Sequence, residues 1–490
     1  MPHAPRSTAL LQTAAARLRG GDLPAAIAAF DEALALDPRQ PDAWFNLAWA
    51  QRATRQFDAA LASYAQAIAQ GDPQPEQAHL NRATILSDHL FRPAAALVEL
   101  EHALHANRGF LPAWLNLGNL HEDLGDRGAA RRAYTEVLQR APGDGRAHAR
   151  LAAIDVADGA AGAAVARLRT VLPHAASVED RADMLFALGN ALDATGDAGD
   201  AFQAIEAANW IARSIAPTAY DPAAHTRLVD ALISAYPAPP PPAPAPAPVP
   251  APPVGATTPL FICGMFRSGS TLVEKILGQH AAITPGGELE AIPAIVQSLA
   301  RYPATLTADE IAMLRARYLD ELPGTGIVTD KRCDNFLHIG LIKTLFPEAR
   351  VLHTRRNVLD TLLSTWFLQF GDGVTYGTDL RDAVHYYLNY RRLMAHWEQV
   401  YGDAIVTVDY DALVTDPRAT VSHTLATLGL DWDDACLSAP DSPVAVRTAS
   451  AWQVRRPIHR ESLHRWHRYR AQLGGVIALL EQHGVDVGAG

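Results

Sequence analysis

The feature that most constrains the fold is a repeat of about 34 residues in the first half of the chain. Each unit pairs an alanine with a bulkier residue one helical turn later. The six pairs are Ala26/Phe30, Ala60/Tyr64, Ala96/Leu100, Ala130/Tyr134, Ala164/Leu168 and Ala201/Ile205, and their second members lie 34, 36, 34, 34 and 37 residues apart. Small residues let two antiparallel helices approach closely, and large ones fill the space between neighbouring pairs. Residues 8–212 are therefore predicted to form a solenoid of about six helix pairs.

A second pattern precedes the alanine in several units. It reads Trp44-x2-Leu47-Ala48, Trp114-x2-Leu117-Gly118 and Leu185-x2-Leu188-Gly189, and Pro38 and Pro142 fall where a second helix must end. Together the two patterns resemble the tetratricopeptide repeat, although an unrelated alanine-rich helical bundle is an alternative. The resemblance implies a concave surface for a peptide or protein partner. Dimerisation through the repeats is a competing role.

The repeat region is followed by a predicted helical extension (213–235) and by a Pro/Ala-rich segment (236–256). From Tyr236 to Pro253 the sequence reads YPAPPPPAPAPAPVPAPP. Such a sequence favours the extended polyproline II conformation and excludes helix and sheet. We predict that it is a spacer that holds the two halves apart.

Composition excludes several classes of protein. At 490 residues the chain suits two or three domains, and its formal net charge of −11 argues against a nucleic-acid binder. No uncharged apolar run is long enough to span a membrane, and the N-terminus lacks the pattern of a signal peptide. Cys263, Cys333 and Cys436 are too scattered for a metal site or a disulfide framework. We expect a cytoplasmic protein that contains no metal.

A phosphate-binding loop is predicted directly after the spacer. Residues 259–263 read as a short apolar strand, Gly264–Thr271 as a glycine-bearing turn, and 272–279 as a helix. Backbone N–H groups at such a turn converge on an anion. The spacing is that of a Walker A loop, but Ser270 replaces the lysine, which argues against hydrolysis of ATP or GTP. Arg267 offers two donors to anionic oxygens instead.

Residues 267–271 (Arg-Ser-Gly-Ser-Thr) resemble the 5′-phosphosulfate loop of sulfotransferases, especially the tyrosylprotein sulfotransferases. The resemblance extends over residues 257–485. It implies a P-loop-like α/β domain with a central parallel sheet, and 3′-phosphoadenosine 5′-phosphosulfate as co-substrate. It also implies that Arg267, Ser268, Gly269, Ser270 and Thr271 bind the phosphosulfate. Some bacterial members of the family carry tetratricopeptide repeats in front of this domain.

The same resemblance implies the catalytic residues. Glu288 falls where the family carries its catalytic base, and a carboxylate can accept the acceptor's proton. Lys331 matches the lysine that stabilises charge on the leaving 5′-phosphate. Ser450 matches a serine that closes over the phosphosulfate. Arg267, Lys331 and Ser450 together are implied to stabilise the transferring group.

Further residues are implied to hold the co-substrate. Arg356 and Ser364 have the eight-residue spacing of the 3′-phosphate motif, with Arg355 as the alternative arginine. Tyr410 matches a tyrosine that contacts the co-substrate, and Arg465 falls where the family has a lysine. Ser450 belongs to this set as well.

Three positions depart from the family pattern. The secretory-pathway enzymes carry a disulfide-forming cysteine two residues before the catalytic glutamate and another two before the lysine. This chain has Gly286 and Thr329 at those positions, which agrees with a reducing compartment. The family's second 3′-phosphate arginine is Leu368 here.

The sequence therefore predicts transfer of a sulfuryl group to an acceptor hydroxyl, with the repeats recruiting the acceptor or a partner. A peptide tyrosine, a carbohydrate and a small phenol all remain possible acceptors. The alternatives are a catalytically inactive repeat adaptor and a P-loop nucleotide kinase.

Overall fold

The structure is a computed structural model that describes residues 3–237, 257–370, 373–438 and 458–488. It contains two compact units: residues 1–160 with 173–176, and residues 161–172 with 177–490. Most of the predicted spacer (238–256) and the predicted site residue Ser450 lie outside the described residues.

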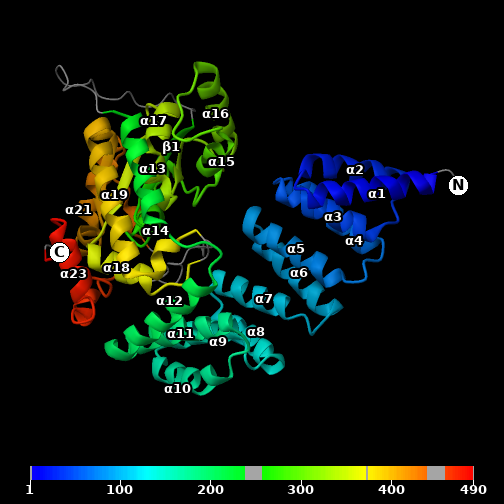
Figure 1. Cartoon of the computed structure of the whole chain (residues 1–490), viewed down its shortest axis with the longest axis horizontal. Coiled ribbons are helices and arrows are strands. Elements are labelled where there is room, and N and C mark those ends of the chain that lie inside the picture. The colour runs from blue at the N-terminus through cyan, green and yellow to red at the C-terminus, as the bar shows by residue number, and fades with distance from the viewer. Residues whose placement is uncertain (1–2, 238–256, 371–372, 439–457, 489–490) are drawn as a thin grey trace. The chain divides into compact units, whose positions relative to one another are not determined.

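The first unit is built entirely from helices in its described part (Figure 1). They are α1 (His3–Arg19), α2 (Leu23–Leu36), α3 (Pro41–Ala53), α4 (Phe57–Ala69), α5 (Pro75–Thr84), α6 (Pro93–Ala106), α7 (Leu111–Asp123), α8 (Arg127–Arg140) and α9 (Gly145–Ala157), with a π-helical turn, η1 (Ile85–His89), after α5. Consecutive helices pack as pairs, α1 with α2, α3 with α4, α5 with α6 and α7 with α8.

The residues that define the repeat form the cores of these pairs. All six alanines of the pattern are fully buried, and all six bulky partners are at most 2 % exposed. Gly118 lies so close to the Tyr134 ring that a Cβ atom there would be 2.3 Å from Tyr134 Cε1. The prediction of a repeat solenoid is confirmed, and the small residues occur where two helices touch.

The second unit begins with four further helices. These are α10 (Ala161–Val171), α11 (Val178–Thr195), α12 (Ala198–Ile215) and α13 (Pro222–Ala235). The last repeat pair, α11 and α12, is as close as the earlier ones, since a Cβ atom on Gly189 would lie 2.5 Å from Ile205 Cγ1.

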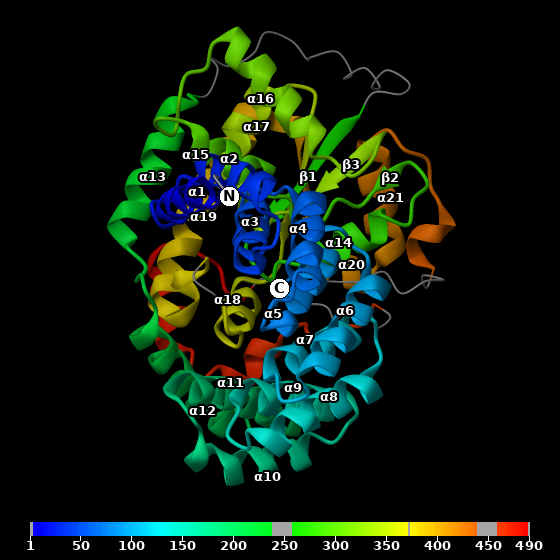
Figure 2. The ribbon, with the colours of Figure 1, turned by 90° about the vertical axis from the view of Figure 1, so that its right-hand side faces the viewer.

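The rest of the second unit is an α/β domain around a five-stranded sheet. The strand order is β2-β3-β1-β4-β5, and every pairing is parallel. The strands are β1 (Thr258–Gly264), β2 (Ile283–Thr284), β3 (Ile327–Asp330), β4 (Arg350–Arg355) and β5 (Ile405–Asp409), and Figure 2 shows β1, β3 and β2 side by side. The central strand β1 is almost wholly buried, as its unbroken apolar run predicts.

Helices connect the strands or follow the last of them, which confirms the predicted parallel α/β fold. They are α14 (Ser270–Leu277), α15 (Ala291–Ser298), α16 (Ala308–Asp320), α17 (Ile339–Leu345), α18 (Val358–Trp366), α19 (Leu380–Tyr401), α20 (Tyr410–Thr415), α21 (Pro417–Thr427) and α23 (Gly474–Gln482). Among the 3₁₀ turns, η3 (Cys333–His338), η4 (Thr375–Thr378) and η7 (Arg465–Tyr469) border the site described below.

The end of the repeat array packs directly on this α/β domain. Asn190 Nδ2 donates to the Phe367 carbonyl at 3.1 Å, and Asn209 Nδ2 donates to the Trp366 carbonyl at 2.9 Å. Helix α13 packs along α19, where the His225 ring stacks on Tyr386 with centroids 4.5 Å apart.

The compact units therefore do not divide at residues 236–256, where the sequence predicted the division between halves. The 3.6-residue periodicity predicts which face of a helix is buried, but not whether a second face has a partner. The bounds predicted for the repeats (8–212) and for the transferase domain (257–485) stay predictions.

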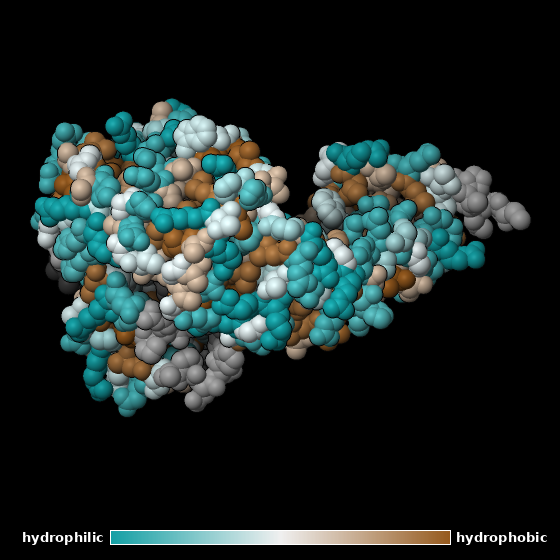
Figure 3. All heavy atoms as spheres, turned by 90° about the horizontal axis from the view of Figure 1, so that it is seen from below, coloured by the Kyte–Doolittle hydropathy of each residue, from teal (hydrophilic) through white to brown (hydrophobic). Residues whose placement is uncertain are grey.

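No helix within the described ranges combines the length and apolar character needed to cross a membrane. On the face shown in Figure 3, hydrophobic side chains lie in separate groups among hydrophilic ones.

Candidate active site

The candidate site lies where the strands of the parallel sheet end. Because all five strands run the same way, the residues that follow them share one edge of the sheet. In sheet order these residues are Glu288 after β2, Lys331 after β3, the 264–271 loop after β1, Arg356 after β4 and Tyr410 after β5. The chain leaves β1 towards β2 and leaves β4 towards β5, so the connections diverge between the neighbours β1 and β4. Ligands of open α/β sheets bind in such a crevice.

The loop after β1 has the conformation of an anion-binding turn. Gly269 adopts φ of 100° just before α14, and a Cβ atom there would lie 2.4 Å from the Tyr410 ring. Arg267 also adopts a positive φ, 71°, which is uncommon for a residue with a side chain. Ser268 is buried, and its hydroxyl bonds to Thr354 Oγ1 at 2.6 Å. The Ser268 side chain therefore anchors the loop to β4.

Four of the predicted ligands, Arg267, Ser364, Arg356 and Tyr410, meet in the crevice. Arg267 Nε donates to Ser364 Oγ at 2.9 Å, and Arg356 Nη1 donates to the Arg267 carbonyl at 3.3 Å. The Arg356 guanidinium also lies over the Tyr410 ring, 4.8 Å from its centroid. The structure thus joins the predicted phosphosulfate loop and the predicted 3′-phosphate motif in one place.

These side chains concentrate positive charge. Burial lowers the pKa of Arg267 to about 10, and repulsion from Arg356 and Arg465 acts in the same direction. The Nε atoms of Arg356 and Arg465 are buried and have no hydrogen-bond partner among the described residues. Buried cationic donors are costly unless an anion pairs with them. The cluster therefore fits a ligand with more than one anionic group, as the predicted co-substrate has.

Arg465 lies near this cluster but also contacts the repeat array. Its guanidinium forms an ion pair with Asp193 of α11 at 3.0 Å and lies 4.2 Å from the centroid of the Phe367 ring. Asp193 also accepts a hydrogen bond from Tyr469 at 2.6 Å. A residue of the last repeat thus holds a predicted co-substrate ligand, which the sequence pattern did not indicate.

Glu288 and Lys331 form an ion pair, in which Lys331 Nζ donates to Glu288 Oε1. The Lys331 side chain is 1 % exposed and that of Glu288 is 43 % exposed. Burial works against the charged form of Lys331, yet the acidic groups of Cys333 and Glu288 raise its pKa above the ordinary value. The pair joins a buried lysine, whose charged form its neighbours favour, to a carboxylate that is partly open to solvent.

A hydrogen-bonded bridge holds the loop of Glu288 against β3. Gly286 N donates to Thr329 Oγ1 at 3.0 Å, and this hydroxyl donates to Glu274 Oε1 at 2.6 Å. Gly287 N donates to the same Glu274 oxygen at 2.9 Å. The bridge joins the two positions at which the family resemblance places a disulfide in the secretory enzymes. Glu274 is buried in α14 and was not singled out in the sequence.

The remaining predicted residues are Ser270, Thr271, Tyr410 and Ser450. The Ser270 hydroxyl contacts Cys333 Sγ at 3.2 Å, and Tyr410 bonds through its hydroxyl to Ser462 Oγ at 2.7 Å. Thr271 follows Ser270, the first residue of helix α14. Ser450 lies outside the described residues.

Asp360 is a further residue that sequence reasoning did not assign to the site. Its buried carboxylate accepts hydrogen bonds from the backbone of His464 and Trp466, at 2.8 and 2.9 Å. It therefore fixes the segment of Arg465 to α18.

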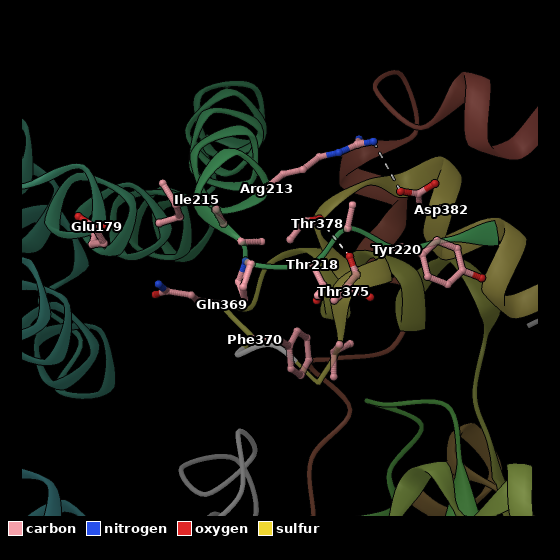
Figure 4. Close-up of a pocket in the computed structure, with 15 residues that line it drawn as sticks. Glu179, Arg213, Ile215, Thr218, Tyr220, Gln369, Phe370, Thr375, Thr378 and Asp382 are labelled. Atoms are coloured by element: carbon pink, nitrogen blue, oxygen red, sulfur yellow. Dashed lines mark hydrogen bonds and ion pairs between the residues drawn. The ribbon is translucent and has the colours of Figure 1, made fainter. Parts of the chain in front are cut away.

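A pocket of about 270 Å³ lies between the end of α12 and the segment around η4 (Figure 4). Figure 4 shows Arg213 of α12 extending towards Asp382 of α19, with a separation of 3.9 Å. Phe370 on the pocket wall packs edge-on against Phe266, next to Arg267, with ring centroids 5.7 Å apart. A ligand in this pocket would touch both the last repeat and the domain that carries the site.

Comparison with known proteins agrees with this geometry. Residues 259–434 match the model of the sulfotransferase family, and residues 11–75 and 111–154 match models of the tetratricopeptide repeat. The chain thus carries a sulfotransferase-family domain behind tetratricopeptide repeats, as the sequence predicted.

Three curated relatives are similar over about half of the chain. An uncharacterized protein of Aquifex aeolicus is 35 % identical over 46 % of this chain and 32 % of its own length. A protein-tyrosine sulfotransferase of Drosophila melanogaster is 26 % identical over 42 % of this chain and 46 % of its own length. Protein-tyrosine sulfotransferase A of Caenorhabditis elegans is 26 % identical over 48 % of this chain and 69 % of its own length. The chain thus spans less than half the length of the first two.

Proposed function

We propose that the sulfotransferase-family domain transfers a sulfuryl group from 3′-phosphoadenosine 5′-phosphosulfate to a hydroxyl of a protein or peptide, with tyrosine the favoured acceptor. The observation that carries the proposal is the crevice between β1 and β4. There Arg267 and Arg356, with Arg465 nearby, concentrate positive charge beside the Ser364 hydroxyl.

The donor would lie along this crevice. Arg356 and Ser364 would bind its 3′-phosphate, and the backbone of the 267–271 loop with Arg267 would bind its phosphosulfate. Charge-assisted bonds of this kind are about twice as strong as neutral ones. Tyr410 beside Gly269 would close one side of the donor site.

Glu288 and Lys331 would carry out the proton transfer and the charge stabilisation. The Glu288 carboxylate takes the proton of the acceptor hydroxyl. At the same time the acceptor's hydroxyl oxygen bonds to sulfur, and the bond from sulfur to the 5′-phosphate oxygen breaks. Lys331 and Arg267 stabilise the negative charge that grows on that phosphate oxygen, and Ser450 would add a third donor. The products are a sulfate ester and 3′-phosphoadenosine 5′-phosphate.

Two considerations favour a protein hydroxyl. Relatives named protein-tyrosine sulfotransferases match this chain at 26 % identity. In addition, tetratricopeptide arrays provide an extended surface that suits peptides. A peptide held on the repeats would reach the active site at a raised effective concentration.

Transfer of radiolabelled sulfate from the donor to tyrosine peptides, glycans and small phenols would test the proposal. Glu288→Gln should lower kcat by about 10²–10⁴-fold, because the base is lost while the shape is kept. Affinity for 3′-phosphoadenosine 5′-phosphate, measured by calorimetry, should stay within about twofold, since in the proposed arrangement Glu288 faces the acceptor and not the bisphosphate.

Glu290→Gln is the matched control, because Glu290 lies two residues away and pairs with Arg332 instead of Lys331. It should keep wild-type turnover. Equal losses in both variants, or tighter binding of Mg²⁺-ATP than of the bisphosphate, would contradict the proposal.

A further inference from the structure

Helices α5 and α6 of the third repeat carry a cluster of side chains that sulfuryl transfer does not use. His79 lies on α5, and Glu99 and His102 lie about one turn apart on α6. Each residue offers one ligand atom, and these atoms all lie within 4.8 Å of one another. Among the residues that the structure describes, these three side chains are close enough together to hold one metal ion.

The three side chains already face one point. His79 Nδ1 and Glu99 Oε2 are 2.7 Å apart, and the rings of His79 and His102 have centroids 5.2 Å apart. Glu99 is buried, His79 is half-buried and His102 is exposed. The cluster therefore has an inner wall fixed by packing and an outer side open to solvent.

Arg82 fixes the orientation of the carboxylate. Its Nη2 donates to Glu99 Oε1 at 2.6 Å, and its Nη1 donates to the Leu61 carbonyl at 2.6 Å. The other carboxylate oxygen, Oε2, is thereby turned towards His79. Carboxylates that bind metals are commonly held in this way by a second hydrogen bond.

We propose that His79, Glu99 and His102 form a binding site for a divalent transition metal, with Zn²⁺ as the best-fitting ion. Two imidazoles and one carboxylate are a ligand set that zinc uses, with a water in the fourth position. Magnesium and calcium prefer sites made of oxygen ligands alone, so this donor set selects against them. The ion would enter past His102 and link α5 to α6.

Such a link would stabilise the repeats and not the chemistry. His79 and Glu99 come from the two helices of one pair, so the ion would cross-link them where their buried faces meet the solvent. A ligand that binds only the folded state raises the free energy of unfolding. The proposal is thus independent of the donor, the acceptor and the catalytic residues.

The test is calorimetric titration of the full-length chain with ZnCl₂ after removal of metals by EDTA. One Zn²⁺ per chain should bind with micromolar affinity, and His102→Ala should weaken binding at least about tenfold. Exposed His105, three residues further along α6, supplies the matched control, and His105→Ala should bind Zn²⁺ as the wild type does.

Two further readouts separate lost ligation from a damaged fold. Zn²⁺ should raise the Tm of the wild type and of His105→Ala but not that of His102→Ala, whose circular dichroism spectrum should match the wild type. Co²⁺ should give the intense visible absorption of a low-coordinate site in the wild type, and His102→Ala should lack this absorption. Zn²⁺ binding that is millimolar, or equal in His102→Ala and the wild type, would overturn the proposal.

Discussion

The Thr329 hydroxyl lies between the loop that carries Glu288 and helix α14, and it bonds to both. It accepts from the Gly286 amide and donates to Glu274, whose carboxylate also holds Gly287. Lys331 follows two residues later, directly after β3, and its amide donates to the Gly287 carbonyl at 2.7 Å. The hydroxyl thus sets the distance between the proposed base and the proposed cation.

Thr329→Val should therefore lower kcat about tenfold or more, because the loop loses one bond to β3 and the Gly286 amide is left without its acceptor. The KM for the donor should change little, since the crevice around Arg356 is untouched. Steady-state kinetics would separate the two effects. Thr329→Ser keeps the hydroxyl and should keep most of the turnover, and an equal loss in both variants would contradict a positioning role.

Substitution of Arg356 tests whether this arginine, and not Arg355, binds the 3′-phosphate. Arg356→Ala should weaken binding of 3′-phosphoadenosine 5′-phosphate by roughly 1.5–3 kcal/mol, the value of a lost charge-assisted hydrogen bond. Affinity for adenosine 5′-phosphosulfate, which lacks the 3′-phosphate, should change far less. Calorimetry with both ligands would measure the difference.

The neighbouring Arg355 is exposed and provides the control. Arg355→Ala should bind both ligands as the wild type does. If Arg355→Ala lost the bisphosphate and Arg356→Ala did not, the assignment would have to be exchanged.

At the scale of residues, the family resemblance named Arg267, Glu288, Lys331 and Arg356, and their roles stay predictions. The structure places each of them after a strand of the parallel sheet, at one edge of that sheet. Glu274 and Asp193 were not predicted, because they act on residues far away in the sequence. A carboxylate within a helix gives no sign of the loop or the helix that it will meet.

At the scale of elements, a buried carboxyl joins β3 to the helix that covers it. Tyr318 of α16 donates to Asp330 Oδ2 at 3.0 Å, and both side chains are fully buried. Burial raises the pKa of Asp330 to about 7, although the hydrogen bond from Tyr318 acts in the opposite direction. In the unfolded chain the carboxyl has its ordinary pKa of 3.8.

This difference predicts a pH dependence of stability. The folded state keeps a proton that the unfolded state releases, so the stabilisation is complete below about pH 4 and is lost as the pH rises to about 7. Asp330→Asn cannot ionise. The free energy of unfolding of the variant, relative to the wild type, should therefore grow by up to about 1.4 kcal/mol per pH unit across that window.

Denaturant unfolding between pH 5 and pH 8 would measure this difference. The Asn335 side chain interacts with the Asp330 carboxyl, so the new amide lies beside a side-chain amide with which it can exchange a hydrogen bond. Asp320→Asn, at an exposed position on α16, should show no such trend. A constant difference between Asp330→Asn and the wild type across the range would show that Asp330 is ionised in the folded state.

The elements themselves were predictable to different degrees. The repeat helices followed from a period that recurs six times, and the β1 strand and its loop followed from an apolar run and a glycine-bearing turn. The packing of α13 on α19 was not predictable, because the sequence of α13 shows one apolar face and does not name its partner.

At the scale of the whole molecule, the second unit contains the last repeat pair together with the transferase fold. Two asparagines of that pair, the exposed Asn190 and the buried Asn209, bond to carbonyls at the end of α18, the helix that carries Ser364. Asp193 pairs with Arg465 close to the same helix. These contacts make the end of the solenoid a structural part of the site.

Chain truncation tests this arrangement. A protein that begins at Ala161 keeps every element of the second unit and should fold and bind 3′-phosphoadenosine 5′-phosphate with near-native affinity. A protein that begins at Ala256 has lost α11, α12 and α13. It exposes the apolar surface they cover, and it leaves the Trp366 and Phe367 carbonyls and Arg465 without their partners. Each buried polar group that loses its partner costs about 1–3 kcal/mol, a large fraction of the stability of a domain.

We therefore expect the protein that begins at Ala256 to be insoluble, or to unfold at a Tm well below that of the longer one and to bind the bisphosphate weakly. Thermal unfolding and calorimetry of both proteins provide the comparison. Equal Tm and equal affinity would show that the repeats are joined to the transferase fold only by the chain. The first unit, which the protein that begins at Ala161 lacks, is still expected to bind the acceptor in the full-length chain. The KM for a protein acceptor should then rise in the protein that begins at Ala161, while turnover of a small phenol, where one is accepted, stays the same.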